Sequence, residues 1–135
     1  MSILIVEDDD GVRESLSEIL VEEGYSVDTV PDGPTALRYL QDHPLPTLIL
    51  LDLVMPNMSG AEFRNRLLAD EQLAAIPIIV LSARNDGAKI ARLLGAEDFL
   101  SKPMNFDELI HVVQNRAVTE VGGIDPLPPG GSPRN

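Results

Sequence analysis

Residues 48–52 read LILLD, four consecutive apolar residues that end on an aspartate. The runs at 3–6 and 78–81 are also apolar throughout, which is typical of strands that are buried on both faces of a parallel sheet. Two weaker runs, at 25–30 and 99–100, indicate flanking strands. The sequence therefore predicts five short strands, three of them buried and two flanking.

Segments with helical periodicity lie between these runs. The first carries an apolar stripe at the spacing i, i+4, i+7 and i+8, formed by Val12, Leu16, Ile19 and Leu20. Four more helices are expected, with starts near Pro34, Ser59, Asp86 and Asn105. Ser59 with Glu62, and Asn105 with Glu108, have the spacing of helix caps. Five strands that alternate with five helices predict an α/β fold, in which helices cover both faces of a parallel sheet.

Composition and charge limit the kinds of function. The 135 residues, 44% of them apolar, suffice for one globular domain, which we expect to span residues 1–118. Residues 119–135 are rich in proline and glycine and are expected to be a flexible tail or a truncated linker. The net charge of -12 disfavours nucleic acid and anionic membranes as direct partners. The chain has no cysteine and no basic leader with an apolar core, so we expect a cytoplasmic protein without disulfides.

Polar residues follow four of the predicted strands. The acidic run Glu7–Asp10 comes after the first, Asp52 after the third, Ser82 after the fourth and Lys102 after the fifth. In open parallel sheets, ligands bind at the carboxyl ends of the strands, where the strand order reverses. We therefore expect these residues to meet at one edge of the sheet, although they are far apart in sequence.

The acidic residues indicate a metal site. Three carboxylates in one pocket repel each other and raise each other's pKa values unless a cation neutralises them. Oxygen ligands with room for water suit Mg²⁺, and we assign Asp8, Asp9 and Asp52 to it. Asp10 is assigned to the cap of the first helix. The alternative is that the whole run caps this helix, because acidic residues favour helix N-termini.

The remaining polar residues indicate chemistry at Asp52. A carboxylate can act as a nucleophile and form an aspartyl phosphate, although an aspartate here can also simply begin a turn before Pro56 and Gly60. Lys102 supplies a positive charge that suits a phosphoryl oxygen, or it is an ordinary surface lysine. Ser82 offers a hydroxyl donor to the same oxygens, or it caps the helix that follows.

Taken together, these residues resemble the receiver domains of bacterial response regulators, which act in two-component signalling. The matching stretches read EDD at 7–9, DLVMP at 52–56, SAR at 82–84 and GAEDFLSKP at 95–103. The resemblance covers about residues 1–117. It implies a flavodoxin-like, doubly wound (βα)5 fold with strand order 2-1-3-4-5. It also implies a phosphorylation switch rather than an enzyme, one that catalyses only its own phosphorylation and slow dephosphorylation.

The resemblance further implies roles for single residues. Asp52 would accept a phosphoryl group from a sensor histidine kinase or a histidine phosphotransfer protein. The cofactor would be Mg²⁺, or Mn²⁺ in its place, with ligands from Asp8, Asp9, Asp52 and the backbone carbonyl of Val54. Lys102 would contact the phosphoryl group, and its bond to Pro103 would be cis. Ser82 and Phe99 would form the switch, although an aromatic residue in an edge strand is often simple packing.

The implied output is a changed surface for a downstream effector protein or an output domain. That surface would lie on the fourth helix, the fifth strand and the fifth helix, where exposed residues are Lys89, Arg92 and His111; a solvated helix face explains these equally well. The segment 85–89 is shorter than in many receivers, so the fourth helix is expected to start late. The apolar Val54 implies a long-lived phosphoryl group. Dimerisation, and whether the chain is a single-domain regulator or part of a longer protein, stay open.

Two other functions are considered. An interaction module without phosphorylation would not need the full set of Asp8, Asp9, Asp52, Ser82 and Lys102. A hydrolase of the haloacid dehalogenase type would need a second acid two residues after its nucleophile, and this chain has Val54 there. Both alternatives are therefore disfavoured.

Overall fold

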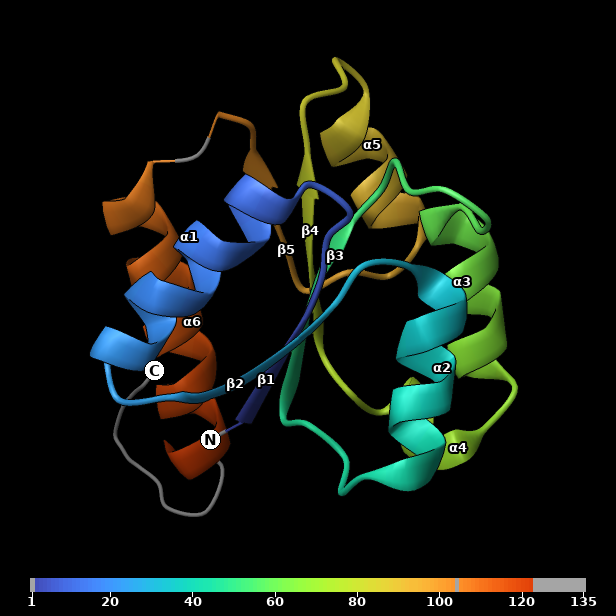
Figure 1. The fold of residues 1–135 in the computed structure, drawn as a ribbon, viewed down its shortest axis with the longest axis horizontal. Helices are drawn as coiled ribbons and strands as arrows, with labels where there is room; N and C mark the ends of the chain where they lie inside the picture. Colours follow the sequence, from blue (N-terminus) through green and yellow to red (C-terminus); the bar gives the residue numbers. More distant parts are fainter. Residues whose placement is uncertain (1, 104, 123–135) are drawn as a thin grey trace. The chain divides into compact units, whose positions relative to one another are not determined.

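The computed structural model describes residues 2–103 and 105–122. It contains a five-stranded parallel sheet, which Figure 1 shows. The strands are β1 (Ser2–Val6), β2 (Ser26–Val30), β3 (Leu48–Asp52), β4 (Ile78–Ser82) and β5 (Asp98–Ser101). Their order in the sheet is β2-β1-β3-β4-β5, and every neighbouring pair is parallel. The predicted α/β fold and its strand order are confirmed.

Six helices occur in the described residues, whereas five were expected. They are α1 (Asp10–Glu22), α2 (Gly33–Asp42), α3 (Gly60–Leu68), α4 (Glu71–Ala74), α5 (Gly87–Leu93) and α6 (Phe106–Gly122). The additional helix, α4, has four residues, which is too short for a helical stripe to show in the sequence. Asp70 initiates it, because its Oδ1 accepts the N–H groups of Gln72 at 2.8 Å and Leu73 at 3.2 Å.

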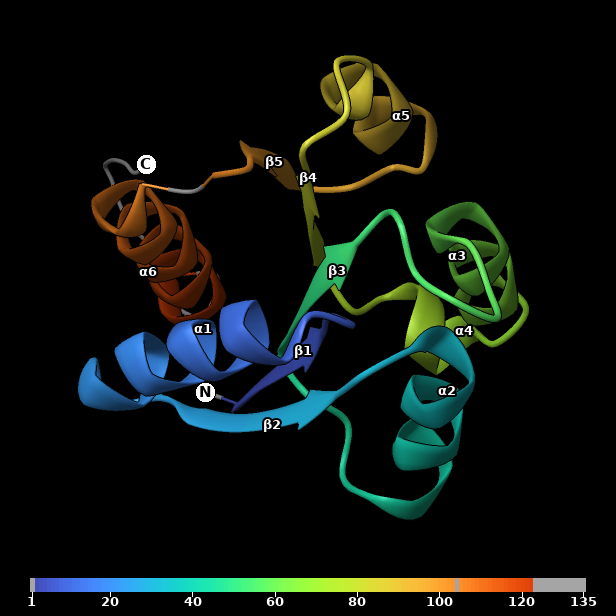
Figure 2. The ribbon, with the colours of Figure 1, turned by 45° about the horizontal axis from the view of Figure 1, so that its top comes forward.

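Helices lie on opposite faces of the sheet in Figures 1 and 2, with α1 on one side and α2, α3 and α5 on the other. The core beneath α2, α3 and α5 joins Leu4 and Leu51 of the sheet with Phe63 and Leu67 of α3. Successive side chains of a strand point to opposite faces, so a strand covered on both sides must be apolar at every position. Accordingly, all five residues of β3 and of β4 are buried.

The caps of two helices test the expected helix starts. Ser59 Oγ accepts the N–H of Glu62 at 3.1 Å, which confirms the cap of α3. The cap predicted for α1 is wrong by one position. Asp9 is the N-cap residue, and its Oδ1 accepts the N–H of Val12 at 2.9 Å, while Asp10 is already the first helical residue. Four acidic residues in a row fit the cap pattern almost equally, so the sequence could not distinguish them.

Residues from Asn105 onward form a second structural unit. Asn105 Oδ1 accepts the N–H groups of Asp107 at 2.8 Å and Glu108 at 3.2 Å, which confirms the expected cap of α6. The helix continues to Gly122, and the tail expected at 119–135 stays a prediction. Residues 123–135 of that expected tail lie outside the described residues. Within the described part of the chain, no helix has the length and apolar character needed to span a membrane.

Candidate functional site

The register of the strands brings the polar residues together. In the β1–β3 pair Val6 lies opposite Leu51, so the residues that follow them, Glu7 and Asp52, lie level at the carboxyl edge. In the β4–β5 pair Ser82 lies opposite Ser101, which places Lys102 at the same edge. Strand order reverses between β1 and β3, which is where ligands bind in sheets of this type.

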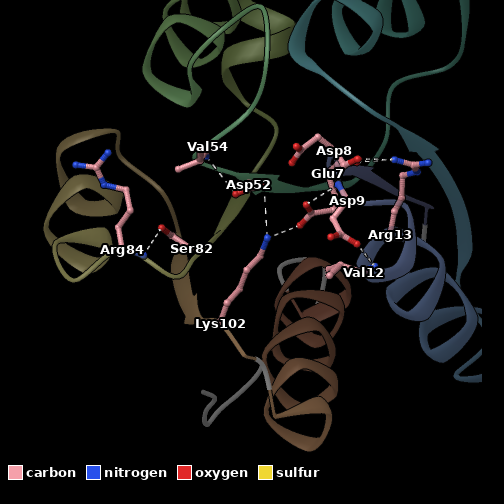
Figure 3. A network of polar contacts seen from close by, with 10 residues as sticks. All are labelled: Glu7, Asp8, Asp9, Val12, Arg13, Asp52, Val54, Ser82, Arg84 and Lys102. Carbon is pink, nitrogen blue, oxygen red and sulfur yellow. Dashed lines mark hydrogen bonds and ion pairs between the residues drawn. The ribbon is translucent and has the colours of Figure 1, made fainter.

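Lys102 is the cation of this edge, and two carboxylates share it (Figure 3). Its Nζ lies 2.6 Å from Oε1 of Glu7 and 3.5 Å from Oδ2 of Asp52. Glu7 is fully buried and Asp52 is 5% exposed. Buried carboxylates need partners, because an unpaired charge away from water is strongly destabilising. The alternative that Lys102 is an ordinary surface lysine therefore does not fit this structure. Its bond to Pro103 is cis.

The second oxygens of the same carboxylates accept backbone hydrogen bonds. Glu7 Oε2 accepts the N–H of Asp9 at 3.1 Å, and Asp52 Oδ1 accepts the N–H of Val54 at 3.1 Å. Each carboxylate is thus fixed by one cationic and one backbone partner. The side chain of Asp52 is held in place at the strand end rather than free to rotate in solvent.

Burial raises the pKa of Asp52 to about 7, from 3.8 for a free aspartate, and the charge of Glu7 raises it as well. The N–H of Val54 and the charge of Lys102 act in the opposite direction without cancelling this rise. For Lys102, burial alone would lower the pKa. The hydrogen bond to Glu7 and the charges of Asp52 and Glu7 outweigh burial, so the pKa of Lys102 lies above its usual value.

Three carboxylates come close enough to share a cation. Among the described residues, one oxygen each of Glu7, Asp8 and Asp52 lies within 4.8 Å of the other two. Asp9 is expected from the sequence to be a metal ligand, but one of its carboxylate oxygens caps α1, and Glu7 takes the place in the cluster. Within the described part of the chain, Lys102 is the cation that pairs with this cluster, so one positive charge faces three carboxylates. The excess of negative charge favours a divalent cation with oxygen ligands.

An open cleft of about 560 Å³ gives access to this cluster. Its walls include the carboxylates of the cluster, Lys102, the exposed side chain of Val54, and Arg84. Arg84 pairs with Asp86, with Nε 2.9 Å from Oδ1. Arg84 was not predicted as a site residue, because nothing in the sequence shows that its side chain borders a cleft.

Ser82 is fully buried beside the cleft, and its hydroxyl has a local partner. Its Oγ accepts the N–H of Arg84 at 3.0 Å. Phe99 lies close to Ser82, and both border Gly87. A Cβ added to Gly87 would come 2.7 Å from Cε1 of Phe99 and 3.2 Å from Cβ of Ser82. Gly87 therefore leaves the space in which the ring packs against the start of α5. The ring is partly buried against the core.

Comparison with known proteins identifies the family. The family model described as the response regulator receiver domain matches residues 3–114. The chain belongs to this family. The resemblance based on the EDD, DLVMP and SKP stretches is thereby confirmed, and the receiver is a signalling domain consistent with a phosphorylation-dependent switch.

Individual relatives agree with the family model. The receiver is 38% identical over 118 residues to Response regulator Rre1 of Synechocystis sp., covering 85% of this chain and 51% of that protein. The chain spans about half the length of the curated relatives it matches. Among solved structures, chemotaxis response regulator CheY4 of Vibrio cholerae superposes with a TM-score of 0.78 at 30% identity, covering 85% of this chain and 97% of that one. Response regulator TrrA of Thermotoga maritima, solved in complex with Mg²⁺ and BeF, gives 0.75 at 33% identity with the same two coverages.

Proposed function

We propose that the receiver is a phosphorylation-dependent switch in which Asp52 accepts a phosphoryl group from a histidine kinase or a histidine phosphotransfer protein. The observation that carries the proposal is the position of Lys102, whose ammonium lies between the buried carboxylates of Glu7 and Asp52 at one end of an accessible cleft. A cation at this place can attract the oxygens of a phosphoryl donor, and the carboxylate beside it can attack the phosphorus.

The proposed step forms one bond and breaks one. An oxygen of the ionised Asp52 attacks the phosphorus of a phosphohistidine in line, and the bond from phosphorus to the imidazole nitrogen breaks. The electron pair of that bond returns to the imidazole, and Asp52 becomes an aspartyl phosphate. Lys102, which lies beside the carboxylates of Glu7 and Asp52 before the reaction, then balances the negative charge of the transferred phosphoryl group. Positioning and charge neutralisation supply most of what phosphoryl transfer requires.

The residues present fit a divalent metal ion. Carboxylate oxygens of Glu7, Asp8 and Asp52 converge within 4.8 Å, and Val54 borders the same cleft. We propose Asp8 and Asp52 as carboxylate ligands of Mg²⁺, with Mn²⁺ as a substitute, and Glu7 rather than Asp9 as the third acidic partner. When bound, the ion would neutralise the carboxylates and the oxygens of the incoming phosphoryl group.

The switch would involve Ser82 and Phe99. A phosphoryl group on Asp52 gives the Ser82 hydroxyl a new acceptor, for which it would leave the N–H of Arg84. Because Phe99 packs against Gly87 beside Ser82, a move of Ser82 changes the space available to the ring. The phosphoryl group would thus shift the population between two arrangements of α5 and β5 and change the surface presented to an effector or output domain.

Labelling with acetyl phosphate tests this function. The receiver is incubated with acetyl phosphate and Mg²⁺, and intact mass reports any added phosphoryl group. We expect labelling of the wild type that EDTA prevents, and no labelling of Asp52→Asn. Sustained release of phosphate from simple esters would instead favour a hydrolase.

Two matched variants test the revised ligand set. Asp8→Asn should raise the Mg²⁺ concentration needed for half-maximal labelling, because it removes a proposed ligand. Asp9→Asn should change this concentration little, because asparagine caps a helix about as well as aspartate. Labelling of Asp52→Asn would show that another residue is the acceptor. No labelling of any form by acetyl phosphate or by a histidine kinase would favour the interaction module.

A further inference from the structure

Arg13 of α1 contacts the acidic run Glu7–Asp10, mainly through the backbone of this run. Its Nη1 donates to the backbone carbonyl of Glu7 at 2.8 Å and lies 3.5 Å from the carbonyl of Asp8 (Figure 3). Its Nη2 pairs with the carboxylate of Asp10. The side chain is 18% exposed. One guanidinium therefore contacts three of the four residues that link β1 to the first turn of α1.

These contacts differ from those of an ordinary surface arginine. The planar guanidinium offers several donors in a fixed fork, and its hydrogen bonds are strengthened by charge. Here Nη1 lies against the backbone carbonyls of two residues whose side chains line the cleft, with the shorter contact to Glu7. The carboxylate of Glu7 is held on its other side by Lys102 and by the N–H of Asp9. The segment is thus fixed both through its backbone and through its side chains.

We infer that Arg13 is a positioning residue for the metal site, which holds the backbone of Glu7 and Asp8 so that their carboxylates stay within reach of Asp52. This inference rests on the proposed function, because it takes Asp8 and Asp52 as ligands and Glu7 as their partner. Groups that orient the ligands of a metal typically change its affinity by about 10- to 100-fold when they are removed. Arg13 contacts the backbone of the ligands and is partly exposed, so its removal should change the metal affinity by a factor near the lower end of this range.

The positive charge of Arg13 makes the inference easy to refute. As a charge alone, Arg13 repels a cation, so its removal would tighten metal binding. As a positioning group, it keeps the ligands together, so its removal would weaken metal binding. The two roles predict opposite signs for the same substitution.

The experiment measures Mn²⁺ affinity by electron paramagnetic resonance of the free ion, without any phosphodonor. The variants are Arg13→Met, which keeps the length of the side chain, Arg13→Lys, which keeps its charge, and the control Arg66→Met. Arg66 is also a helical arginine with an acidic partner one turn earlier, since it lies 3.8 Å from Glu62, but it is 59% exposed on α3. We expect the Kd to rise about tenfold in Arg13→Met, to rise less in Arg13→Lys, and to change by less than about twofold in Arg66→Met.

A second readout separates positioning from general stability. In labelling with acetyl phosphate, Arg13→Met should raise the half-saturating Mg²⁺ concentration by about the same factor as the Kd, while the rate at saturating Mg²⁺ changes by less than about twofold. A rate loss that saturating Mg²⁺ does not restore would overturn the inference. If circular dichroism shows that Arg13→Met is unfolded, Arg13→Lys decides, because any weakening there reflects lost carbonyl contacts and not lost charge.

The outcomes are distinct from those that test the function. Unchanged or tighter Mn²⁺ binding by Arg13→Met, in a wild type that labels on Asp52, overturns only the role of Arg13. A wild type that neither binds Mn²⁺ nor labels would overturn the proposed function itself, and the inference with it.

Discussion

Ionisation of the Asp52 carboxyl should destabilise the metal-free receiver as the pH rises, and the substitution Asp52→Asn should remove this effect. This carboxyl has a pKa of about 7 in the folded protein because it is buried, against about 3.9 in an unfolded chain. Between these pH values the folded state keeps a proton that the unfolded state has lost. The free energy of unfolding therefore falls with rising pH on account of this group, and the loss is complete above pH 7.

The size of the effect follows from the same two pKa values. Each pKa unit corresponds to about 1.36 kcal/mol, so ionising the buried carboxyl costs roughly 4 kcal/mol at high pH. Between about pH 5 and about pH 8, the difference in unfolding free energy between Asp52→Asn and wild type should grow by roughly 2–3 kcal/mol. The other titrating groups are common to both proteins and largely cancel in this difference.

Urea unfolding in EDTA, followed by circular dichroism at several pH values, measures this difference. Glu18→Gln is the control, because it makes the same change of charge at an exposed position of α1. A difference between Asp52→Asn and wild type that stays constant from about pH 5 to about pH 8 would refute the reasoning, since the carboxyl would then already be ionised at the lower pH. Adding Mg²⁺ at about 100 times its Kd should stabilise the wild type by about 2.7 kcal/mol and the variant much less.

Three further substitutions test the charge of the site, the packing beside it and the packing of the core. Lys102→Met leaves the buried Glu7 without the ammonium 2.6 Å away and should lower the free energy of urea unfolding by roughly 3 kcal/mol; a loss near zero would contradict a stabilising ion pair at this place. Gly87→Ala places a Cβ 2.7 Å from the ring of Phe99 and should cost about 1–3 kcal/mol, less the gain of about 1 kcal/mol in helix propensity. The cost of Gly87→Ala should shrink in a Phe99→Leu background, and equal costs in both backgrounds would contradict the contact. Phe63→Ala empties a fully buried position and should cost about 3–5 kcal/mol in the same assay, whereas a cost below about 1 kcal/mol would mean that the core collapses around the gap.

The strands were predictable because each central one must be apolar at every position. In an α/β sheet covered on both faces, burial leaves no polar position along a strand, so the runs at 3–6, 48–51 and 78–81 give the strand positions to within one residue. The helices with a full apolar stripe were predictable for the same reason. The short helix α4 was missed because its four residues complete little more than one turn and hold no stripe.

The site was predictable at single residues that end a strand and less so in the acidic run. Asp52 and Ser82 each end a buried run, Lys102 follows the short flanking strand β5, and the structure brings all three to one edge of the sheet. In the acidic run, four neighbouring residues could each have been ligand or cap. Composition and spacing are the same for both assignments, and only the point at which the extended chain turns into α1 distinguishes them.

The change from extended chain to helix gives each acidic residue of this run different contacts. Glu7 still continues the extended strand and therefore lies level with Asp52, where it meets Lys102. Asp9 has the extended backbone of a cap residue, and its carboxylate accepts a free N–H of the first turn. Its neighbour at position 10 has entered the helix and pairs with the guanidinium that also holds the carbonyl of Glu7. The four negative charges are thus not interchangeable: two contribute oxygens to the cluster with Asp52, one starts the helix, and one pairs with the guanidinium.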